Sequence, residues 1–424
     1  MSETFRRFFM KEVPSRWIVC QIGAREHYAV ARALERQGAL RALVTDFWIE
    51  PGSVLGRLPG GRRLADRYHG ELRSATVVAP NLRMLGFELA NRMRSGGGWP
   101  TILKRNRLFQ RLALRELAAV AKSGEVPITV FSYSYAAREL FRYAKERGWT
   151  TVLGQIDPGP EEERIVVAEH ARFGGIGSSW QPVPGAYWES WKEEVALADR
   201  VIVNSRWSRD CLVKEGVDER KLEVVPLVFS AGTAVGDDRV GGLGEVGERR
   251  LRILFLGQVN LRKGVARLLE AMRLLRDEAV ELTLAGPSEI DPAAWADLPM
   301  VRWVGPVPRS MVAGYYQAAD LFILPTLSDG YALTQLEAMA HGLPVLASRY
   351  CGEAVRAGEN GFVIEEVSAE GIAAAIREAR GRLPLRGVRA PAFTLDDLGC
   401  ELRRCGGEGV ADREAGVESA CLES

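Results

Sequence analysis

Short apolar runs recur along this chain, and most are soon followed by a Gly, Asp or Ser and then by a helical pattern. In the first half the runs are Trp17–Ile22, Leu40–Val44, Ile128–Phe131, Thr151–Ile156 and Arg200–Val203. In the second half they are Leu251–Leu256, Val280–Leu284, Val301–Val304, Leu321–Leu324 and Pro344–Ala347. Because these runs are continuously apolar rather than alternating, they predict strands covered on both faces, as in parallel sheets. The repeated strand–helix unit therefore predicts doubly wound α/β domains.

One stretch interrupts this rhythm. Residues 229–248 are rich in Gly and acidic residues and almost free of large apolar side chains, so we expect a flexible linker. The predicted organisation is a leader over 1–15, a Rossmann-like domain over 16–228, a linker over 229–249, a second such domain over 250–392, a helix over 393–405 and a disordered tail over 406–424. Two parallel-sheet domains joined in this way face a cleft at the carboxyl ends of their strands, where ligands bind.

Charge balance and cysteine usage exclude several classes of protein. The 56 Lys and Arg nearly balance the 55 Asp and Glu, so the chain lacks the broad basic field of a nucleic-acid-binding protein. Its six Cys include no CxxC pair, which predicts neither a metal site nor a disulfide framework and favours the cytoplasm. No apolar run reaches the roughly 18–20 residues that span a bilayer.

The N-terminus mixes aromatic and basic residues, namely Phe5, Arg6, Arg7, Phe8, Phe9 and Lys11. It has no long apolar segment of the kind found in signal peptides. We interpret it as a frayed leader. The alternative is a weak peripheral contact with an anionic membrane, which would place the protein at the inner face of that membrane.

The strongest functional signal lies within residues 324–344. A predicted strand ends at Leu324, a helix is expected to begin near Leu333 or Thr334, and the loop between them carries Asp329, Gly330, Tyr331 and Ala332. Gly330 lets the backbone approach a ligand closely. The amides at the start of the following helix would form a pocket for phosphate.

Glu337 follows Asp329 by eight residues and is expected in the first turn of that helix. One carboxylate on the loop and one on the helix could grip hydroxyl groups at two ends of an elongated ligand. A structural explanation competes with this one, because Thr334 and Glu337 have the spacing of a capping box.

A second signal lies within Leu254–Gly264. The strand ends at Gly257, and Arg262 and Lys263 come just before the helix predicted over Val265–Leu274. The sequence is not a P-loop, but two cations after a strand suit a diphosphate. They would also supply the charge stabilisation that a metal ion gives elsewhere. The alternative is a solvated Arg-Lys pair.

Residues 251–366 resemble the donor-binding domain of glycosyltransferase family 4. The members of this family are retaining enzymes with the two-domain GT-B fold. The resemblance rests on motifs in family order: Gly257 with Lys263-Gly264, LTLAG (282–286), VRWVGPVP (301–308), YYQAADLFILPT (315–326), Asp329 with Glu337, EAMAHGLPVLAS (337–348) and ENGFVI (359–364). In the first half, residues 197–217 and 222–227 resemble the end of the family's acceptor-binding domain. The resemblance covers most of residues 15–405.

The resemblance implies donor-binding roles residue by residue. Lys263 and Arg262 would hold the diphosphate, Glu337 the ribose and Asp329 the transferred sugar, and these four would carry the catalysis. The full donor-binding set is Gly23, Gly257, Arg262, Lys263, Val307, Pro308, Asp329, Gly330, Tyr331, Ala332, Leu333, Thr334 and Glu337. Many members have Glu, Arg and Gly where this chain has Asp329, Gln258 and Ala332, which leaves the identity of the donor sugar open.

The first domain offers weaker candidates. Gly23 ends a strand and is followed by a predicted helix start at residues 24–27, as in the family's loop beside the donor phosphates. Candidates to face a sugar or the acceptor are His27, Tyr133, Tyr135, Asp157 and Trp180. Each has a structural explanation too: a solvated His, a turn-forming Asp before Pro, or aromatic rings of the core.

Together with these observations, the resemblance implies a retaining, metal-independent transfer of a hexose from a nucleotide diphosphate sugar to a hydroxyl acceptor, without a further cofactor. The acceptor would be a saccharide, a lipid-linked glycan or a small molecule, as in polysaccharide biosynthesis. The alternatives are an epimerase acting on sugar nucleotides, a phosphorylase on the same architecture, or a catalytically silent protein that binds sugar nucleotides.

Overall fold

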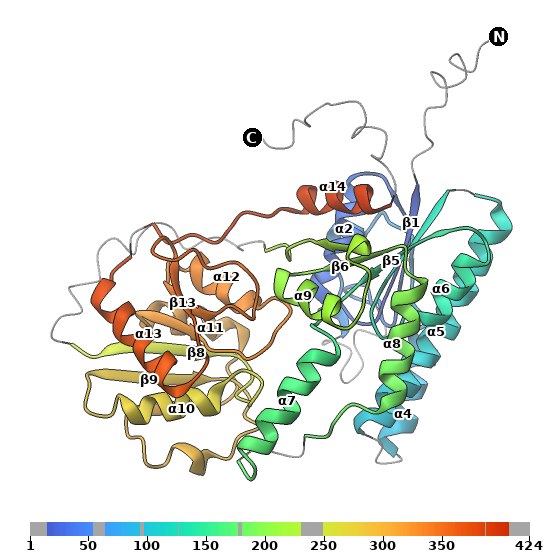
Figure 1. Cartoon of the computed structure of the whole chain (residues 1–424). Helices are drawn as coiled ribbons and strands as arrows, with labels where there is room; N and C mark the ends of the chain where they lie inside the picture. Colours follow the sequence, from blue (N-terminus) through green and yellow to red (C-terminus); the bar gives the residue numbers. More distant parts are fainter. Residues whose placement is uncertain are drawn as a thin grey trace.

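The computed structural model describes residues 15–53, 64–93, 97–125, 127–176, 180–229, 249–385 and 387–406. The predicted leader, linker and tail fall almost entirely outside the described residues. The described chain forms two lobes, each built on a parallel sheet with helices packed against it (Figure 1). The predicted fold class, two doubly wound parallel-sheet domains, is confirmed.

The first lobe is built on a seven-stranded sheet in the order β3-β2-β1-β4-β5-β6-β7, with neighbouring strands parallel. Its strands are β1 (Arg16–Gln21), β2 (Leu40–Thr45), β3 (Val77–Val78), β4 (Ile128–Tyr133), β5 (Thr150–Gly154), β6 (Arg200–Val203) and β7 (Leu222–Val224). Its α-helices are α2 (Ala29–Arg36), α4 (Asn81–Met93), α5 (Gly98–Ser123), α6 (Arg138–Lys145), α7 (Pro160–Arg172), α8 (Gly185–Leu197) and α9 (Arg206–Lys214). Short 3-10 turns are η1 (Arg25–Tyr28), η3 (Gly70–Leu72) and η4 (Glu219–Lys221).

Both faces of this sheet are buried, which explains the continuous apolar runs. Along β1, Ile18 and Cys20 pack in a cluster with residues of α5, α6 and α8. Trp17 and Val19 point to the opposite face and pack with residues of α2. Successive side chains of a strand alternate between faces, so each face needs its own apolar residues.

The second lobe is built on a six-stranded sheet in the order β10-β9-β8-β11-β12-β13, also parallel. Its strands are β8 (Leu251–Leu256), β9 (Val280–Ala285), β10 (Val301–Trp303), β11 (Leu321–Leu324), β12 (Val345–Ser348) and β13 (Gly361–Ile364). Its helices are α10 (Val265–Leu274), η6 (Pro292–Trp295), α11 (Arg309–Ala318), α12 (Leu333–Ala340) and α13 (Ala369–Arg382).

The last described helix, α14 (Leu395–Cys405), returns to the first lobe (Figure 1). Its residues Leu398 and Leu402 are buried in the cluster that holds Trp17 and Leu34 of the first lobe. A capping box starts the helix, since the side chains and backbone amides of Thr394 and Asp397 bond reciprocally. The described chain therefore begins in the first lobe, goes on to build the second lobe and ends on the first lobe.

The predicted helix start after Gly23 is wrong. Glu26, His27 and Tyr28 adopt left-handed backbone angles, with φ of 51°, 51° and 60°, and the α-helix begins only at Ala29. This turn buries Tyr28 completely and brings its ring edge-on to Trp48, at 5.5 Å between centroids. Burial of an aromatic ring offsets the cost of left-handed backbone here.

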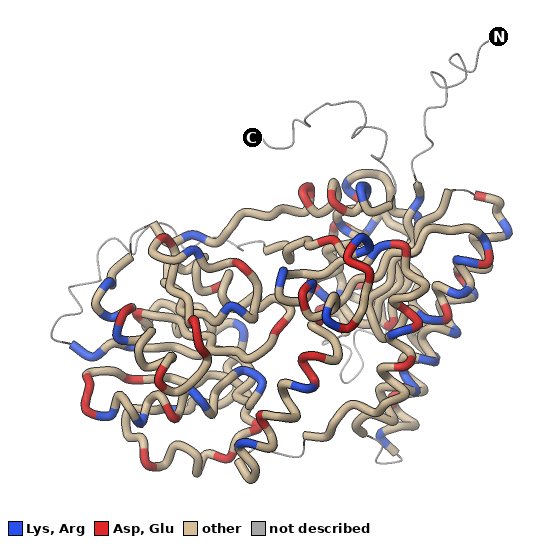
Figure 2. Tube along the Cα trace, viewed as in Figure 1, with Lys and Arg blue, Asp and Glu red and all other residues tan. Residues whose placement is uncertain are grey.

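Acidic and basic residues are interspersed along both lobes (Figure 2), as the balanced composition predicts. In the described part of the chain, no helix is long and apolar enough to cross a membrane.

Candidate active site

The strand order of the second lobe places two functional loops side by side. Because β8 pairs with β11, the loop after β8 and the loop after β11 emerge next to each other at the point where the strand order reverses. Ligands of open α/β sheets bind at this switch point. Arg262 and Lys263 lie on the first loop and Asp329 on the second.

Gly264 permits the close approach of these loops. Its φ is +69°, and a Cβ at this position would overlap the carbonyl oxygen of Pro325. The backbone N–H of Leu327 donates to the carbonyl oxygen of Arg262 at 2.9 Å. Contacts between the two loops therefore fix where the two cations point.

The cations converge on the acid of the second loop. The Lys263 ammonium forms an ion pair with Asp329, and Arg262 lies 3.5 Å from the other carboxylate oxygen. Burial alone would raise the pKa of Asp329, but Lys263 and Arg262 together hold the pKa below its ordinary value. Asp329 is therefore ionised, and the three side chains form one charged cluster.

Glu162 joins this cluster from the first lobe and was missed by the sequence analysis. It lies on α7, 3.6 Å from Arg262, and accepts a hydrogen bond from the Ser328 hydroxyl at 2.9 Å. Trp207 of α9 donates to the same hydroxyl at 3.1 Å. Burial raises the pKa of Glu162 to about 7, although Arg262 opposes the shift. The acidic run after Pro160 was a signal for a helix start, but not for a partner on the other lobe.

Gly330 lies where the two lobes touch. A Cβ on Gly330 would lie 2.5 Å from the side-chain nitrogen of Asn204 and 2.8 Å from the carbonyl oxygen of Ile156. Both neighbours belong to the first lobe. The predicted need for glycine at this position is explained by contact with the other lobe in this structure.

Helix α12 starts at Leu333, as predicted, with buried Ala332 at the N-cap. The expected position of Glu337 in the first turn is wrong, and the competing structural explanation, a capping box, does not apply. Glu337 is the fifth residue of the helix and lies beyond its first turn, and Thr334 does not cap the helix, so no capping box forms. The Glu337 carboxylate instead accepts a hydrogen bond from the Tyr316 hydroxyl at 3.0 Å. The helix starts two residues too early for a capping box, because the N-cap is Ala332 and not Thr334.

Two cavities lie between the lobes beside this cluster. The first, here called the Glu26 cavity, has a volume of about 150 Å³. It is lined by Arg25, Glu26, Val30, Phe131, Tyr133, Gly154, Gln155, Ile156, Ile202, Asn204, Val225, Pro226, Leu227, Asp329, Tyr331, Leu398 and Leu402. Burial raises the pKa of Glu26 to about 7, with Arg25 and a hydrogen bond from Tyr133 opposing the shift.

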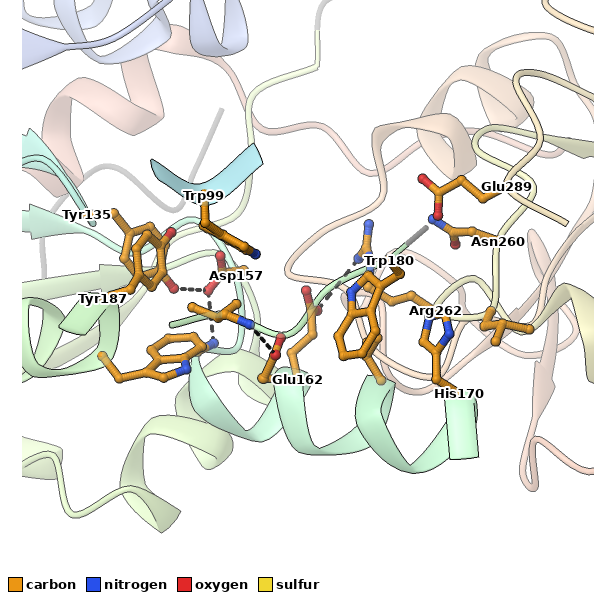
Figure 3. Close-up of a pocket in the computed structure, with 16 residues that line it drawn as sticks. Trp99, Tyr135, Asp157, Glu162, His170, Trp180, Tyr187, Asn260, Arg262 and Glu289 are labelled. Carbon is orange, nitrogen blue, oxygen red and sulfur yellow. Dashed lines mark hydrogen bonds and ion pairs between the residues drawn. The ribbon is translucent and has the colours of Figure 1, made fainter. Parts of the chain in front are cut away.

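The second, here called the aromatic cavity, has a volume of about 240 Å³. From the first lobe it is lined by Trp99, Tyr135, Asp157, Gly159, Glu162, Glu163, Val166, His170, Trp180, Val183, Tyr187 and Trp188, and from the second by Asn260, Leu261, Arg262 and Glu289. Figure 3 shows Trp99, Tyr135 and Tyr187 around Asp157 at one end, and Trp180, His170, Arg262 and Glu289 at the other. Arg262 therefore borders this cavity while contacting Asp329.

The residues predicted to face a sugar or the acceptor lie in different places in the structure. Tyr135, Asp157 and Trp180 line the aromatic cavity, and Tyr133 lines the Glu26 cavity. His27 is exposed and lines neither cavity. Partial desolvation of the ring, together with the positive charges of Arg309 and Arg32, lowers its pKa.

The remaining donor-binding candidates are Gly23, Gly257, Val307 and Pro308. Gly23 has a φ of +76°, and its N–H donates to Asp46 at 2.8 Å. Gly257 directly follows β8, which ends at Leu256 and not at the predicted Gly257, and has a φ of +150°. Val307 packs against the core of the second lobe, and exposed Pro308 caps α11. Among the described residues, no group of three or more His, Cys, Asp or Glu is arranged to hold a metal ion.

Comparison with known proteins gives a family model and several relatives. Residues 250–380 match the model described as glycosyl transferases group 1. Proteins named D-inositol 3-phosphate glycosyltransferase are similar: that of Geodermatophilus obscurus is 32% identical over 250 residues, covering 51% of this chain and 55% of the relative. That of Thermobifida fusca is 32% identical over 193 residues, covering 40% and 44%. The chain thus spans about half the length of the curated relatives it matches.

Solved structures share the fold at low sequence identity. The catalytic domain of starch synthase IV from Arabidopsis thaliana, bound to ADP and acarbose, has a TM-score of 0.62 at 13% identity, covering 94% of this chain and all of that one. Sucrose-phosphate synthase from Thermosynechococcus elongatus has a TM-score of 0.53 at 17% identity, covering 95% and 100%. Anabaena HepE in complex with UDP has a TM-score of 0.52 at 13% identity, with the same coverage.

Proposed function

We propose that this protein is a retaining glycosyltransferase, because residues 250–380 match the model of group 1 glycosyl transferases and the two parallel-sheet lobes have the GT-B arrangement. It would transfer a hexose from a nucleotide diphosphate sugar to a hydroxyl acceptor without a metal ion. The observation that carries this proposal is the convergence of Lys263 and Arg262 on Asp329 at the sheet edge that faces the first lobe.

Donor binding would exchange one set of charge pairs for another. The diphosphate would take the place of the carboxylates now beside Lys263 and Arg262, with the ammonium as a point charge and the guanidinium as a fork. The amides of Gly330, Tyr331, Leu333 and Thr334 at the start of α12 would add a positive dipole end, whereas that of Ala332 already donates to the carbonyl oxygen of Cys351 at 3.1 Å. Asp329, no longer paired with Lys263, would then accept hydrogen bonds from hydroxyl groups of the donor sugar.

Glu337 would hold the ribose of the nucleotide. Tyr316 donates to one of its carboxylate oxygens, which fixes the orientation of the group and leaves the second oxygen available to a hydroxyl. A carboxylate held in one orientation loses little conformational entropy on binding.

The chemical step would occur on one face of the sugar. The bond between the anomeric carbon and the leaving phosphate oxygen breaks, and the acceptor oxygen bonds to that carbon from the same side. The acceptor proton passes to the departing phosphate oxygen. Lys263 and Arg262 stabilise the negative charge that develops on the diphosphate. Contact between the lobes at Gly330 would limit water and thus hydrolysis of the donor.

The test is Lys263→Ala with donor binding and turnover measured separately. The probes are UDP, ADP and GDP, then the sugar nucleotides of whichever binds tightest, with acceptor-dependent product as readout. We expect turnover to fall by about 100-fold or more, because one preformed donor to a developing charge is removed. Lys192→Ala, on the exposed face of α8, is the matched control. Near-normal turnover by a folded Lys263→Ala protein would refute the assignment.

The same assay separates the alternatives. A product that incorporates the acceptor excludes an epimerase. Donor binding without turnover across a broad acceptor panel would favour a silent sugar-nucleotide-binding protein. The cytoplasmic location and the membrane contact of the N-terminus stay predictions.

A further inference from the structure

The aromatic cavity combines fixed rings with an excess of acidic groups. Tyr135 and Tyr187 stack at 4.3 Å between ring centroids, and His170 and Trp180 stack at 4.4 Å. Tyr135 has a left-handed φ of +75°, and its N–H donates to buried Glu194 at 2.6 Å. Such backbone persists only where the surroundings hold it, so one end of the cavity is rigid.

His170 covers one face of the Trp180 ring, since the two rings are nearly parallel, at 11°. The stack orients the indole at the edge of the cavity, where an apolar ligand face can pack against it. The volume of about 240 Å³ is below the roughly 300–1,000 Å³ of sites for drug-sized ligands, so it suits a single sugar ring.

Most ionisable side chains that line the cavity are acidic. Four carboxyl groups line it, those of Asp157, Glu162, Glu163 and Glu289. Among the described lining residues, Arg262 alone carries a permanent positive charge, and it already contacts Glu162 and Asp329. Burial lowers the pKa of His170 and raises the pKa of Asp157, Glu162 and Glu163, so burial favours the neutral form of each of these groups.

The carboxyl groups are also positioned to receive hydroxyl donors. Asp157 is fixed by the Tyr135 hydroxyl at 2.5 Å and by the Gly159 amide at 2.9 Å. Glu163 accepts the Val183 amide at 2.7 Å. Each carboxylate has acceptor capacity beyond these bonds, and sugar hydroxyls supply donors. A phosphate group supplies more negative charge instead.

We propose that the aromatic cavity is the acceptor site and that it selects an uncharged sugar ring over the phosphate ester of that sugar. This inference rests on the proposed transferase function and names its acceptor class. It separates this chain from relatives named D-inositol 3-phosphate glycosyltransferase. The physical basis is that a phosphate would be buried beside four acidic side chains, with a single guanidinium, already shared with Glu162 and Asp329, to compensate its charge.

The test compares neutral sugars with their phosphate esters by ligand-observed NMR. The pairs are glucose and glucose 6-phosphate, N-acetylglucosamine and its 6-phosphate, and myo-inositol and D-inositol 3-phosphate. The protein is the full chain saturated with the best-binding nucleoside diphosphate of UDP, ADP and GDP. We expect at least one neutral sugar to bind about tenfold or more tightly than its ester.

Three variants locate the selectivity. Trp180→Ala should weaken the binding of the neutral sugar about three- to tenfold, and Trp180→Phe should retain most of the affinity that the Ala variant loses. Glu289→Gln should reduce the factor by which the neutral sugar binds more tightly than its phosphate ester. Glu189→Gln, on an exposed position of α8, is the matched control and should leave the ratio unchanged.

Tighter binding of an ester, or no binding of any neutral sugar, would overturn the inference. So would a sugar that binds but is insensitive to Trp180→Ala. The nucleoside diphosphate titration stands apart from these outcomes. If no nucleoside diphosphate binds, the transferase proposal fails; if one binds and the selectivity is reversed, the acceptor inference alone fails.

Discussion

At the scale of single residues, the candidate site is a set of charges that neutralise one another until a donor arrives. Lys263 and Arg262 share Asp329, and Arg262 also contacts Glu162. A buried cation that loses its carboxylate partner is left uncompensated, which is costly. A diphosphate can take the place of the carboxylate and restore the compensation, so Lys263 and Arg262 are suited to bind one. Asp329 therefore has two predicted effects that oppose each other.

The substitution Asp329→Asn separates these effects. We expect UDP, or the preferred nucleoside diphosphate, to bind several-fold more tightly, because Lys263 no longer has a competing carboxylate. Turnover should fall by about 100-fold, because the sugar loses a charged acceptor. Calorimetric titration and initial rates measure the two quantities. Asp297→Asn, which removes an exposed partner of Arg273, is the control. Unchanged turnover would contradict the sugar-binding role.

Glu194 makes a prediction about pH. The side chain is fully buried and accepts the amides of Tyr135, Ala137 and Arg138, yet burial raises its pKa to about 7. A carboxyl with a raised pKa keeps its proton in the folded state after the unfolded chain has lost its own. The stabilisation is therefore present below about pH 4.5 and lost as pH rises towards 7.

We expect Glu194→Gln to flatten the decline in the free energy of unfolding between pH 5 and 8, by up to about 3 kcal/mol. Urea unfolding at several pH values measures the slope, which does not depend on the absolute stability of the variant. Glu189→Gln is the exposed control on the same helix. A slope identical to that of the unsubstituted chain would show that Glu194 is ionised throughout.

At the scale of elements, helix α14 is a clamp from the second lobe to the first. Its Leu402 is fully buried beside Trp17 and Leu34, more than 350 residues earlier in the chain. The helix alone is short and would be marginal in water, so its stability comes from this packing.

Leu402→Ala should lower the free energy of unfolding by about 2–5 kcal/mol, the cost of a large-to-small change in a packed core. Denaturant unfolding checks this value. Leu274→Ala removes the same atoms from a half-exposed position of α10 and should cost far less. Equal losses at both positions would mean that α14 does not dock as described.

At the scale of the whole molecule, Gly330 and Arg267 define how closely the lobes meet. Arg267 of α10 donates two hydrogen bonds to the buried Glu169 carboxylate of α7, at 2.8 and 2.6 Å. Gly330 touches Asn204 and Ile156 across the same boundary. The ion pair between Arg267 and Glu169 holds the lobes together, and the contact of Gly330 sets their closest approach.

Gly330→Ala should hold the lobes apart, because its Cβ would overlap Asn204 and Ile156. We expect turnover to fall by about 100-fold, because a small misplacement of reacting groups carries a cost of this size. The radius of gyration from small-angle scattering should rise, with little change in unfolding. Gly314→Ala is the control, since a Cβ there meets nothing within 4 Å. Normal turnover with an unchanged radius would refute the role.

The success of the sequence analysis also varies with scale. The strands over 200–203, 251–256 and 321–324 and the helix over 265–274 coincide with β6, β8, β11 and α10. These elements have continuous apolar runs or a clear helical period, so local pattern suffices. The turn at Glu26–Tyr28 was mispredicted because its left-handed backbone depends on the burial of Tyr28 against Trp48.

The amino-acid sequence by itself determined the two parallel sheets and the positions of Arg262, Lys263 and Asp329 at strand ends. Apolar periodicity is local, and parallel topology brings the carboxyl ends of neighbouring strands to one edge. Only the tertiary structure decided that Glu162 reaches Arg262, that Asn204 meets Gly330 and that α14 packs on the first lobe. These contacts join residues 100 or more positions apart, and their geometry follows from how two lobes pack, which spacing along the chain does not encode.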